Sequence, residues 1–187
     1  MSGEIITERL IIADALESDI NMIIGIEKAP DNHDFICDGT YEEHLSEIND
    51  DKHLLLLFRR KFDGIPVGFS LSCIDFESDI FELRRIVIID KGKGFGREAM
   101  NGHFRYAFEQ AGMNRFWLDV YPNNEIGIKL YDSLNMHRDG ILRQSYKTDK
   151  GYLDQIIYSM LKREYFEMRG KNEENPYRIY PISFQDS

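Results

Sequence analysis

The hydrophobic positions of this chain form short runs separated by turn-rich polar segments. The runs at 5–13, 54–58, 67–74 and 81–89 have the length and the β-branched and aromatic content of strands. Asp63-Gly64, between the second and third runs, predicts a hairpin turn. Further strands are predicted at 116–121, 141–148 and 152–160, the last two joined by a turn at 149–151. The first half of the chain therefore favours antiparallel strands.

Other segments have apolar residues at helical spacing. Ser18-Asp19 predicts the start of a short helix that Pro30 ends, and Thr40 with Glu43 forms a capping box for a second. A long helix follows the glycine-rich stretch and stops at Gly112, and another spans 124–134. The predicted order is β-α-α-β-β-β-α-β-α-β-β, an α/β (α+β) fold. Its strand–helix–strand crossover makes the sheet mixed.

Composition and charge narrow the class of protein. The formal charge of −10 and pI near 5.0 disfavour nucleic acid as a partner and favour a cationic substrate. We expect no membrane span and no secretion signal, since no long apolar run is present, and we expect a cytoplasmic location. Two cysteines are too few for a disulfide framework. A metal site built from His33, Asp34, Cys37 and Asp38 is not expected, because no second cluster completes it.

The stretch 86–97 combines an apolar strand, a glycine-rich turn and a helix start. Its glycines, Gly92, Gly94 and Gly96, let the backbone approach a ligand, and the first amides of the helix lack intrahelical acceptors. This pattern suits a phosphate. The G-x-G-x-G spacing matches neither the dinucleotide fingerprint nor the Walker loop. Taken alone, the stretch leaves a tight turn without a ligand open.

Two motifs in the same order resemble the GNAT superfamily of N-acetyltransferases. Lys91-Gly92-Lys93-Gly94-Phe95-Gly96-Arg97 resembles the acetyl-CoA loop of that family. Leu118-Asp119-Val120-Tyr121-Pro122-Asn123-Asn124-Glu125, followed by Leu130-Tyr131, resembles its strand and Asn-led helix with a tyrosine. Thr7-Glu8-Arg9-Leu10 resembles the opening of the ribosomal-protein alanine N-acetyltransferase branch. The resemblance covers residues 5–162.

The resemblance implies acetyl-CoA as co-substrate, no metal, and a role for each matching position. The strand residues expected to pair with pantetheine are Ile86, Val87 and Ile88, and the pyrophosphate-binding amides are those of Gly92, Lys93, Gly94, Phe95, Gly96 and Arg97. Tyr131 is expected to protonate the departing thiolate. Asn124 either caps its helix or binds CoA. The general base is Asp119, where relatives have glutamate, or Glu82 on the strand before the loop.

Three features depart from the family pattern. Lys91 replaces Arg or Gln, Asn135 stands where Gly is usual, and the stretch between Ile88 and Gly92 is short. Asn tolerates the left-handed conformation that a helix end requires, so the second change is mild. The short stretch bears on where the amides lie relative to a pyrophosphate.

The predicted activity is acetyl transfer from acetyl-CoA to a primary amine of a protein N-terminus, a polyamine or another small molecule. A non-catalytic acyl-CoA-binding or regulatory protein on the same fold is the alternative, and an NTP-dependent enzyme is disfavoured. We expect one catalytic domain over residues 1–165 and a linker and tail over residues 166–187. The sequence leaves the acceptor, the choice of base and a homodimer open.

Overall fold

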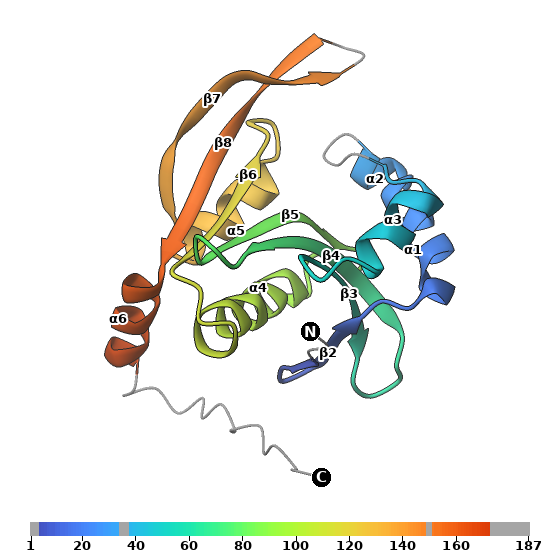
Figure 1. Ribbon diagram of the computed structural model, residues 1–187, viewed down its shortest axis with the longest axis horizontal. Helices are drawn as coiled ribbons and strands as arrows, with labels where there is room; N and C mark the ends of the chain where they lie inside the picture. Colours follow the sequence, from blue (N-terminus) through green and yellow to red (C-terminus); the bar gives the residue numbers. More distant parts are fainter. Residues whose placement is uncertain (1–3, 34–37, 149–150, 173–187) are drawn as a thin grey trace.

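The computed structural model describes residues 4–33, 38–148 and 151–172, which form one eight-stranded mixed sheet with helices on both faces (Figure 1). The spatial order of the strands is β1-β2-β3-β4-β5-β6-β8-β7. Their bounds are β1 Ile5–Ile6, β2 Leu10–Asp14, β3 His53–Arg60, β4 Pro66–Asp75, β5 Ile80–Ile88, β6 Arg115–Val120, β7 His137–Thr148 and β8 Gly151–Leu161. Among the strands of the described residues, only β5 and β6 pair in parallel, as the predicted crossover requires.

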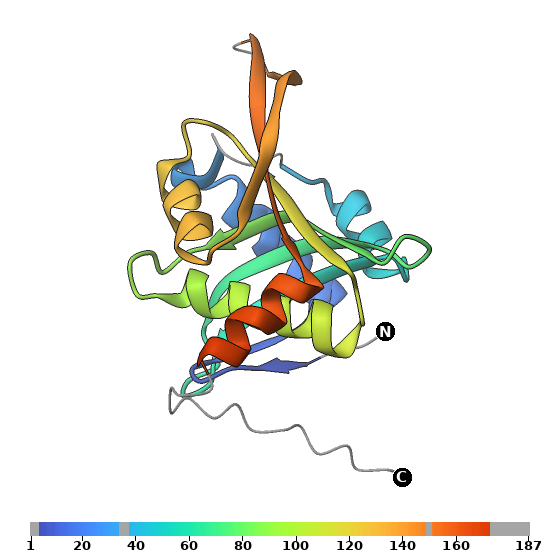
Figure 2. The same ribbon diagram turned by 90° about the vertical axis from the view of Figure 1, so that its left-hand side faces the viewer.

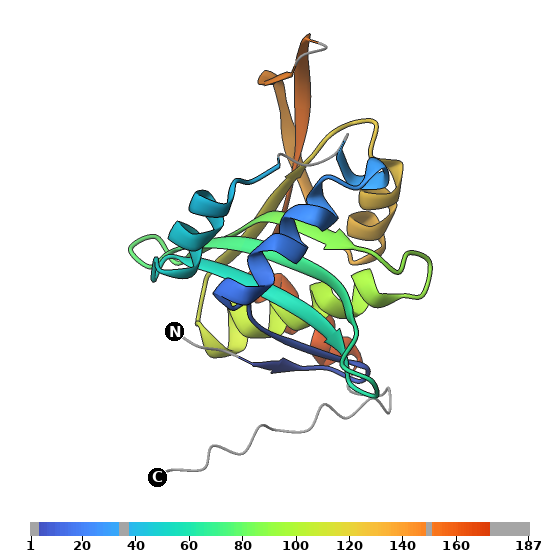
Figure 3. The same cartoon turned by 90° about the vertical axis from the view of Figure 1, so that its right-hand side faces the viewer.

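Helices α1 and α3 cover one face of the sheet, and α4 covers the other (Figures 1 and 3). The β7–β8 hairpin projects away from this body (Figure 2). The helix bounds are α1 Ile20–Glu27, α2 Pro30–His33, α3 Tyr41–Ile48, α4 Phe95–Arg105, α5 Glu125–Ser133 and α6 Lys162–Asn172. A short 3₁₀ turn, Glu17–Asp19, precedes α1, and a π-helical segment, Tyr106–Gln110, extends α4.

The two faces of the sheet have separate cores. Under α4, aromatic rings pack together; Phe81 stacks on Phe116 with 5.1 Å between ring centroids, and Phe104 meets Phe116 edge-on at 4.9 Å. On the other face a smaller, mainly aliphatic cluster includes Ile23 of α1 and Leu71 of β4. Because side chains alternate along a strand, neighbouring residues of β5 and β6 belong to opposite faces.

The mixed sheet, the two hairpins and the Thr40–Glu43 capping box confirm the sequence predictions. The predicted first strand is instead a small hairpin, in which Thr7 N–H donates to Leu10 O at 3.0 Å. Helix α1 ends at Glu27, before Pro30, as predicted, and Pro30 begins the separate helix α2, since proline suits the first position of a helix.

The end of the domain also differs from the prediction. Helix α6 was not predicted, and it includes residues 166–172 of the expected linker and tail. Tyr165 of α6 is buried against Phe108, with ring centroids 5.0 Å apart, so a tertiary contact stabilises a helix whose own sequence is only weakly amphipathic. Residues 173–187, the predicted turn at 149–150 and the loop positions 34–37 lie outside the described residues. Over the described ranges, no helix is long and apolar enough to cross a membrane.

Candidate active site

Strands β5 and β6 diverge after a short parallel contact. Their last paired residues are Glu82 and Trp117, so the edge of β5 from Leu83 onward has no strand partner on the β6 side. The β4–β5 register shifts at the same point: Leu71 opposes Arg85 and Ser72 opposes Leu83. Arg84 is therefore the extra residue of a β-bulge, a feature that bends a strand and increases its twist.

The opening between β5 and β6 contains a cavity of about 190 Å³. Its wall includes parts of β5, β6, α4 and α5. Among the residues that line it are Arg84, Arg85, Ile86, Val87, Ile88, Lys91, Gly96, Asp119, Asn124, Leu130 and Tyr131. Leu118 and Val120 of β6 belong to the core under α4, so the alternating side chain of Asp119 points to the α1–α3 face. The cavity thus has walls from both faces of the sheet.

The glycine loop has the conformation of an anion site. Gly92 and Gly94 have φ of 77° and 82°, values that favour glycine, and Gly94 is the N-cap of α4. The first helical bond of α4 runs from Glu98 N to Gly94 O. Among the described residues, no acceptor is recorded for the backbone N–H groups of residues 92–97. These amides, at the positive end of a helix, can bind an anion.

The N-terminal hairpin holds this loop. Arg9 donates from Nη1 to Lys93 O at 2.9 Å and from Nε to Glu98 at 2.7 Å, and its guanidinium lies 4.7 Å from the centre of the Phe95 ring. Thr7 Oγ1 also donates to Glu98 at 2.6 Å. Burial alone would raise the pKa of Glu98, but the bonds from Thr7 and Arg9 lower it below its usual value. From the sequence, Thr7 and Arg9 were noted only as part of a family resemblance, without a contact to the loop.

The charged side chains of the loop are engaged in the fold. Arg97 donates to Ser133 O at 3.2 Å and to Ser133 Oγ at 2.7 Å, which ties the start of α4 to the end of α5. Lys93 Nζ pairs with Asp90 at 2.9 Å. Phe95 is buried in the core, and a Cβ at Gly96 would touch Leu130 at 3.4 Å. The backbone, more than these side chains, is free to meet a ligand.

The three β5 residues Ile86, Val87 and Ile88 line the cavity with the strand edge that β6 leaves unpaired. Val87 is buried in the α1–α3 core, whereas Ile86 and Ile88 pack on the α4 core. Asn124 also lines the cavity, and its Oδ1 accepts from Gly127 N at 2.9 Å, which caps α5.

Tyr131 reaches the cavity from α5 and is otherwise buried against Tyr158, with ring centroids 5.7 Å apart. Burial, and after it the negative charge of Asp119, raises the pKa of Tyr131 well above that of an ordinary phenol. Among the described residues, no hydrogen-bond partner is recorded for its hydroxyl, whereas Tyr158 donates to Asp132 at 2.8 Å. The Tyr131 hydroxyl is therefore protonated at neutral pH and available as a donor.

Asp119 lies in the cavity wall and accepts a hydrogen bond from Gln155 Nε2 at 2.6 Å. Burial raises the pKa of Asp119, the Gln155 bond opposes this, and the charge of Glu82 adds to the rise. Glu82 is outside the cavity wall and accepts from Arg84 Nε at 3.0 Å. The structure thus brings Asp119 and Tyr131 to one cavity and places Glu82 beside it. Sequence reasoning missed Gln155, which lies 36 residues from Asp119.

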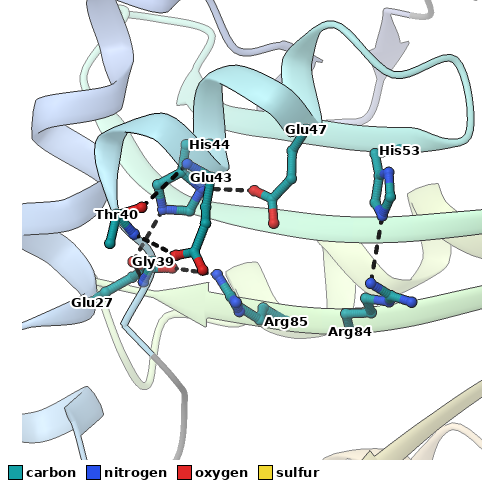
Figure 4. Close-up of polar contacts among 9 residues, drawn as sticks. All are labelled: Glu27, Gly39, Thr40, Glu43, His44, Glu47, His53, Arg84 and Arg85. Carbon is teal, nitrogen blue, oxygen red and sulfur yellow. Dashed lines mark hydrogen bonds and ion pairs between the residues drawn. The ribbon is translucent and has the colours of Figure 1, made fainter.

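A buried charged cluster lies under α3 (Figure 4). Glu27 accepts from Gly39 N at 2.8 Å, from Arg85 Nη1 at 3.0 Å and from His44 Nε2 at 3.1 Å, while His44 Nδ1 meets Glu47 at 2.7 Å. Burial would lower the pKa of His44, but the two carboxylates raise it to about 9. An imidazolium with two donors therefore joins α1 to α3. Sequence reasoning missed this cluster as well.

No group of three or more His, Cys, Asp or Glu side chains suited to a metal ion occurs in the part of the chain that the structure describes. Two of the loop positions considered from sequence, Asp34 and Cys37, lie outside that part, and so does the side chain of His33.

Curated relatives resemble segments of the chain. An uncharacterized N-acetyltransferase p20 of Bacillus licheniformis is 39% identical over 74 residues, which are 40% of this chain and 42% of the relative. A [ribosomal protein bS18]-alanine N-acetyltransferase of Salmonella typhimurium is 34% identical over 68 residues, which are 36% of this chain and 45% of the relative. The matches therefore span less than half of these relatives' own length.

Solved structures share the fold. The acetyltransferase (GNAT family) from Bacillus anthracis aligns with a TM-score of 0.74 and 21% identity over 87% of this chain and 100% of that chain. Spermidine N-acetyltransferase from Vibrio cholerae, solved in complex with CoA and spermine, aligns with a TM-score of 0.76 and 18% identity over 84% and 98%. The profile of the acetyltransferase (GNAT) family matches residues 23–136, which confirms the resemblance carried by the two motifs. The chain belongs to the acetyltransferase (GNAT) family.

Proposed function

We propose that this protein transfers an acetyl group from acetyl-CoA to a primary amine. The observation that carries the proposal is the cavity between the diverging strands, which has the glycine loop at one end and Asp119 with Tyr131 in its wall. An anion-binding end joined to a proton acceptor and a proton donor is what thioester aminolysis needs.

In this proposal the backbone binds most of acetyl-CoA. The amides of residues 92–97, which have no recorded acceptor among the described residues, bind the pyrophosphate at the start of α4. The free edge of β5 offers the N–H and C=O groups of Ile86 and Ile88 to the pantetheine amides, while Val87, whose backbone groups face β4, supplies its place in the strand between them. Asn124 keeps its side-chain Nδ2 for the ligand while its Oδ1 caps α5. Arg9 and Arg97 fix the loop and take no direct part.

The chemistry then needs two proton transfers. The amine nitrogen attacks the thioester carbonyl carbon, a C–N bond forms, and the C–S bond breaks. Asp119 takes the proton that the nitrogen loses, directly or through water, since its raised pKa makes it a stronger base than an ordinary aspartate. Gln155 orients that carboxylate, and Glu82 is the competing base. The Tyr131 hydroxyl, protonated at neutral pH, donates its proton as negative charge develops on the departing sulfur, and CoA leaves as the thiol. The phenoxide regains a proton from Asp119 or from water, which closes the cycle.

Two acceptor classes are suggested by related proteins. A curated relative acts on alanine of a ribosomal protein, and a structural neighbour is a spermidine N-acetyltransferase. A protein N-terminus and a polyamine differ in charge near the reacting amine, so the polar residues around Asp119 decide between them.

The test is a screen of amines and short N-terminal peptides with acetyl-CoA that measures release of free thiol. Turnover that is present in the wild type, lost in Asp119→Asn and kept in Asp132→Asn supports the proposal. Asp132 is the control because it is an aspartate of α5 that lies outside the cavity wall. Calorimetric titration of CoA runs alongside. CoA binding without turnover for every amine would instead favour a non-catalytic acyl-CoA-binding protein.

A further inference from the structure

Two adjacent arginines, Arg84 and Arg85, lie at the β-bulge of β5 and line the cavity (Figure 4). In a bulge both residues oppose a single residue of the partner strand, here Leu71, which belongs to the core on the α1–α3 face. Figure 4 shows Arg85 next to Glu27 beneath α3, and Arg84 next to His53. The two side chains differ in their exposure and in how many of their guanidinium nitrogens have a hydrogen-bond partner.

Arg85 has its partner inside the protein. Its Nη1 donates to Glu27 at 3.0 Å, and its side chain is only 19% exposed. Glu27 is completely buried and also accepts from His44 and from the Gly39 amide. The charge of Arg85 is therefore balanced by a carboxylate that cannot reach water, and breaking that pair would leave Glu27 buried with too few cations.

The guanidinium of Arg84 is only partly hydrogen-bonded within the protein. Its side chain is 45% exposed, and its Nε donates to Glu82 at 3.0 Å. Its Nη1 lies 3.4 Å from Nε2 of His53, whose Nδ1 faces Asp50 at 2.8 Å. Among the described residues, no partner is recorded for Nη2 of Arg84. The open end of the guanidinium fork can therefore receive a carboxylate.

The position of Arg84 separates it from the loop that would bind pyrophosphate. Glu82 and Trp117 are paired, so Arg84 and Asp119 both lie two residues beyond the last contact, on the same face and across the opening from each other. Four residues of strand, roughly 13 Å, separate Arg84 from Ile88, where the glycine loop begins. An anion bound at Arg84 would thus belong to the acceptor.

Resting on the proposed function, we propose that the acceptor carries a carboxylate close to its reacting amine and that Arg84 binds this carboxylate. An acidic residue after a peptide N-terminus and the α-carboxylate of a free amino acid share this chemistry. A polyamine does not, because it would bring a second ammonium toward a guanidinium. The positive charge of Arg84 at the cavity therefore favours an acceptor with a carboxylate, whereas the net charge of −10 alone predicted a cationic substrate.

The test compares acceptors that differ only in the carboxylate. One arm uses Ala-Glu-Ala-Ala and Ala-Gln-Ala-Ala, both with amidated ends; a second uses alanine and alaninamide; spermidine is the third. Each is measured with the wild type, Arg84→Met, Arg84→Lys and Arg59→Met. Arg59 is a matched control, since it is 40% exposed, pairs with Asp19 at 3.0 Å and is outside the cavity wall.

In at least one arm we expect the wild type to prefer the carboxylate over its amide by roughly 10- to 100-fold in kcat/KM, mainly through KM. Arg84→Met should abolish this preference, Arg84→Lys should keep part of it, and Arg59→Met should keep all of it. The amide acceptors correct for any effect of leaving Glu82 unpaired, since that effect is common to both members of a pair.

A wild type that prefers spermidine, or a preference that survives Arg84→Met, would overturn the inference and leave the proposed function standing. Calorimetry of each amine with CoA-saturated protein measures the same preference without turnover. If no amine is acetylated, the proposed function fails, and this binding arm still decides the inference: an Arg84-dependent preference for the carboxylate supports it, and equal binding overturns it.

Discussion

Among the described residues, each face of the sheet buries one histidine completely, and the two histidines have opposite charge states. His103 of α4 donates from Nδ1 to Ala99 O at 2.8 Å, and its Nε2 lies 2.8 Å from Ser70 Oγ, which donates to the ring when the ring is neutral. Burial lowers its pKa to about 4, only partly opposed by the Ala99 bond. His44 of α3 lies between the carboxylates of Glu27 and Glu47, which raise its pKa to about 9.

The difference between the two histidines follows from the size of the hydrophobic core on each face. The α4 face has an extensive aromatic core, which packs α4 against the sheet without a buried charge, and the Arg9–Glu98 pair that fixes the glycine loop is partly exposed. On the other face, α1 and α3 have only eight residues each and a smaller aliphatic cluster. There, Glu27 joins both helices to Arg85 of β5, and a buried ion pair specifies geometry that this small core does not. Asp119 and Tyr131 lie where the two faces meet.

The largest expected effect is on catalysis at that meeting point. Tyr131→Phe removes only the hydroxyl, so kcat should fall about 10²–10⁴-fold, the usual contribution of a general acid. Affinity for acetyl-CoA should barely change, because the lost interaction forms as charge develops on sulfur. Both are measured on an amine that the screen identifies. Tyr158→Phe is the control, since its hydroxyl faces Asp132 and it is outside the cavity wall. Equal kcat values for wild type and Tyr131→Phe would exclude this role.

The next effect tests whether charge holds the α1–α3 face. Glu27→Gln keeps the size of the side chain but leaves His44 and Arg85 without their shared anion, so the free energy of unfolding should fall by about 3–5 kcal/mol. Glu43→Gln, in the exposed capping box of α3, should cost far less, because a glutamine can still accept from Thr40 N–H. Urea denaturation of both variants measures the difference. Similar losses would mean that the buried cluster contributes little.

The two histidines also predict opposite dependences of stability on pH. The folded pKa of His44 is above the unfolded value of 6.5, so its contribution is complete below pH 6.5 and is lost as pH rises through about 9. The folded pKa of His103 is below 6.5, so its contribution is complete above pH 6.5 and is lost as pH falls toward about 4.

His44→Gln should therefore flatten the alkaline side of the stability profile, and His103→Gln the acid side. Thermal denaturation from pH 4 to pH 10 measures both profiles against the wild type, each normalised to its own value at pH 6.5. The prediction fails for either histidine if its variant keeps the wild-type slope on the side assigned to it.

What the sequence could predict was local. The glycine loop, the capping box of Thr40 with Glu43, and the Asn124 cap of α5 follow from residues within a few positions of one another, and each is present. The buried cluster depends on Arg85 and Glu27, which are 58 residues apart, and on a bulge that a period-two pattern does not reveal. Pairing at that distance is decided by the tertiary fold, so neither Arg84 nor His44 was distinguishable from a surface charge.

A smaller effect concerns the backbone of the glycine loop. Gly94 has φ of 82°, and a β-branched residue there is strained by about 1–2 kcal/mol and meets Arg9 Nη2 at 3.4 Å from its Cβ. Gly94→Val should therefore shift the loop amides and weaken CoA binding by roughly 10-fold or more. Gly64→Val has similar strain at φ of 70°, in the β3–β4 turn with no atom near its Cβ. It should lose comparable stability with unchanged CoA affinity in a calorimetric titration. Equal affinities in the two variants would reject the loop as the site.

The smallest effect tests whether buried polar groups contribute to stability on the α4 face of the sheet. Ser70 and Ser72 are both fully buried on β4, but only Ser70 has a partner, His103; for Ser72 Oγ none is recorded among the described residues. Ser70→Ala leaves the His103 Nε2 acceptor buried and unsatisfied, which should cost about 1–3 kcal/mol. Ser72→Ala removes an oxygen that already lacks a partner, so stability should change by less than about 1 kcal/mol and in the stabilising direction. Chemical denaturation of the two variants gives the comparison directly. A larger loss for Ser72→Ala than for Ser70→Ala would contradict the assignment of a neutral, hydrogen-bonded His103 as the polar element that this face depends on.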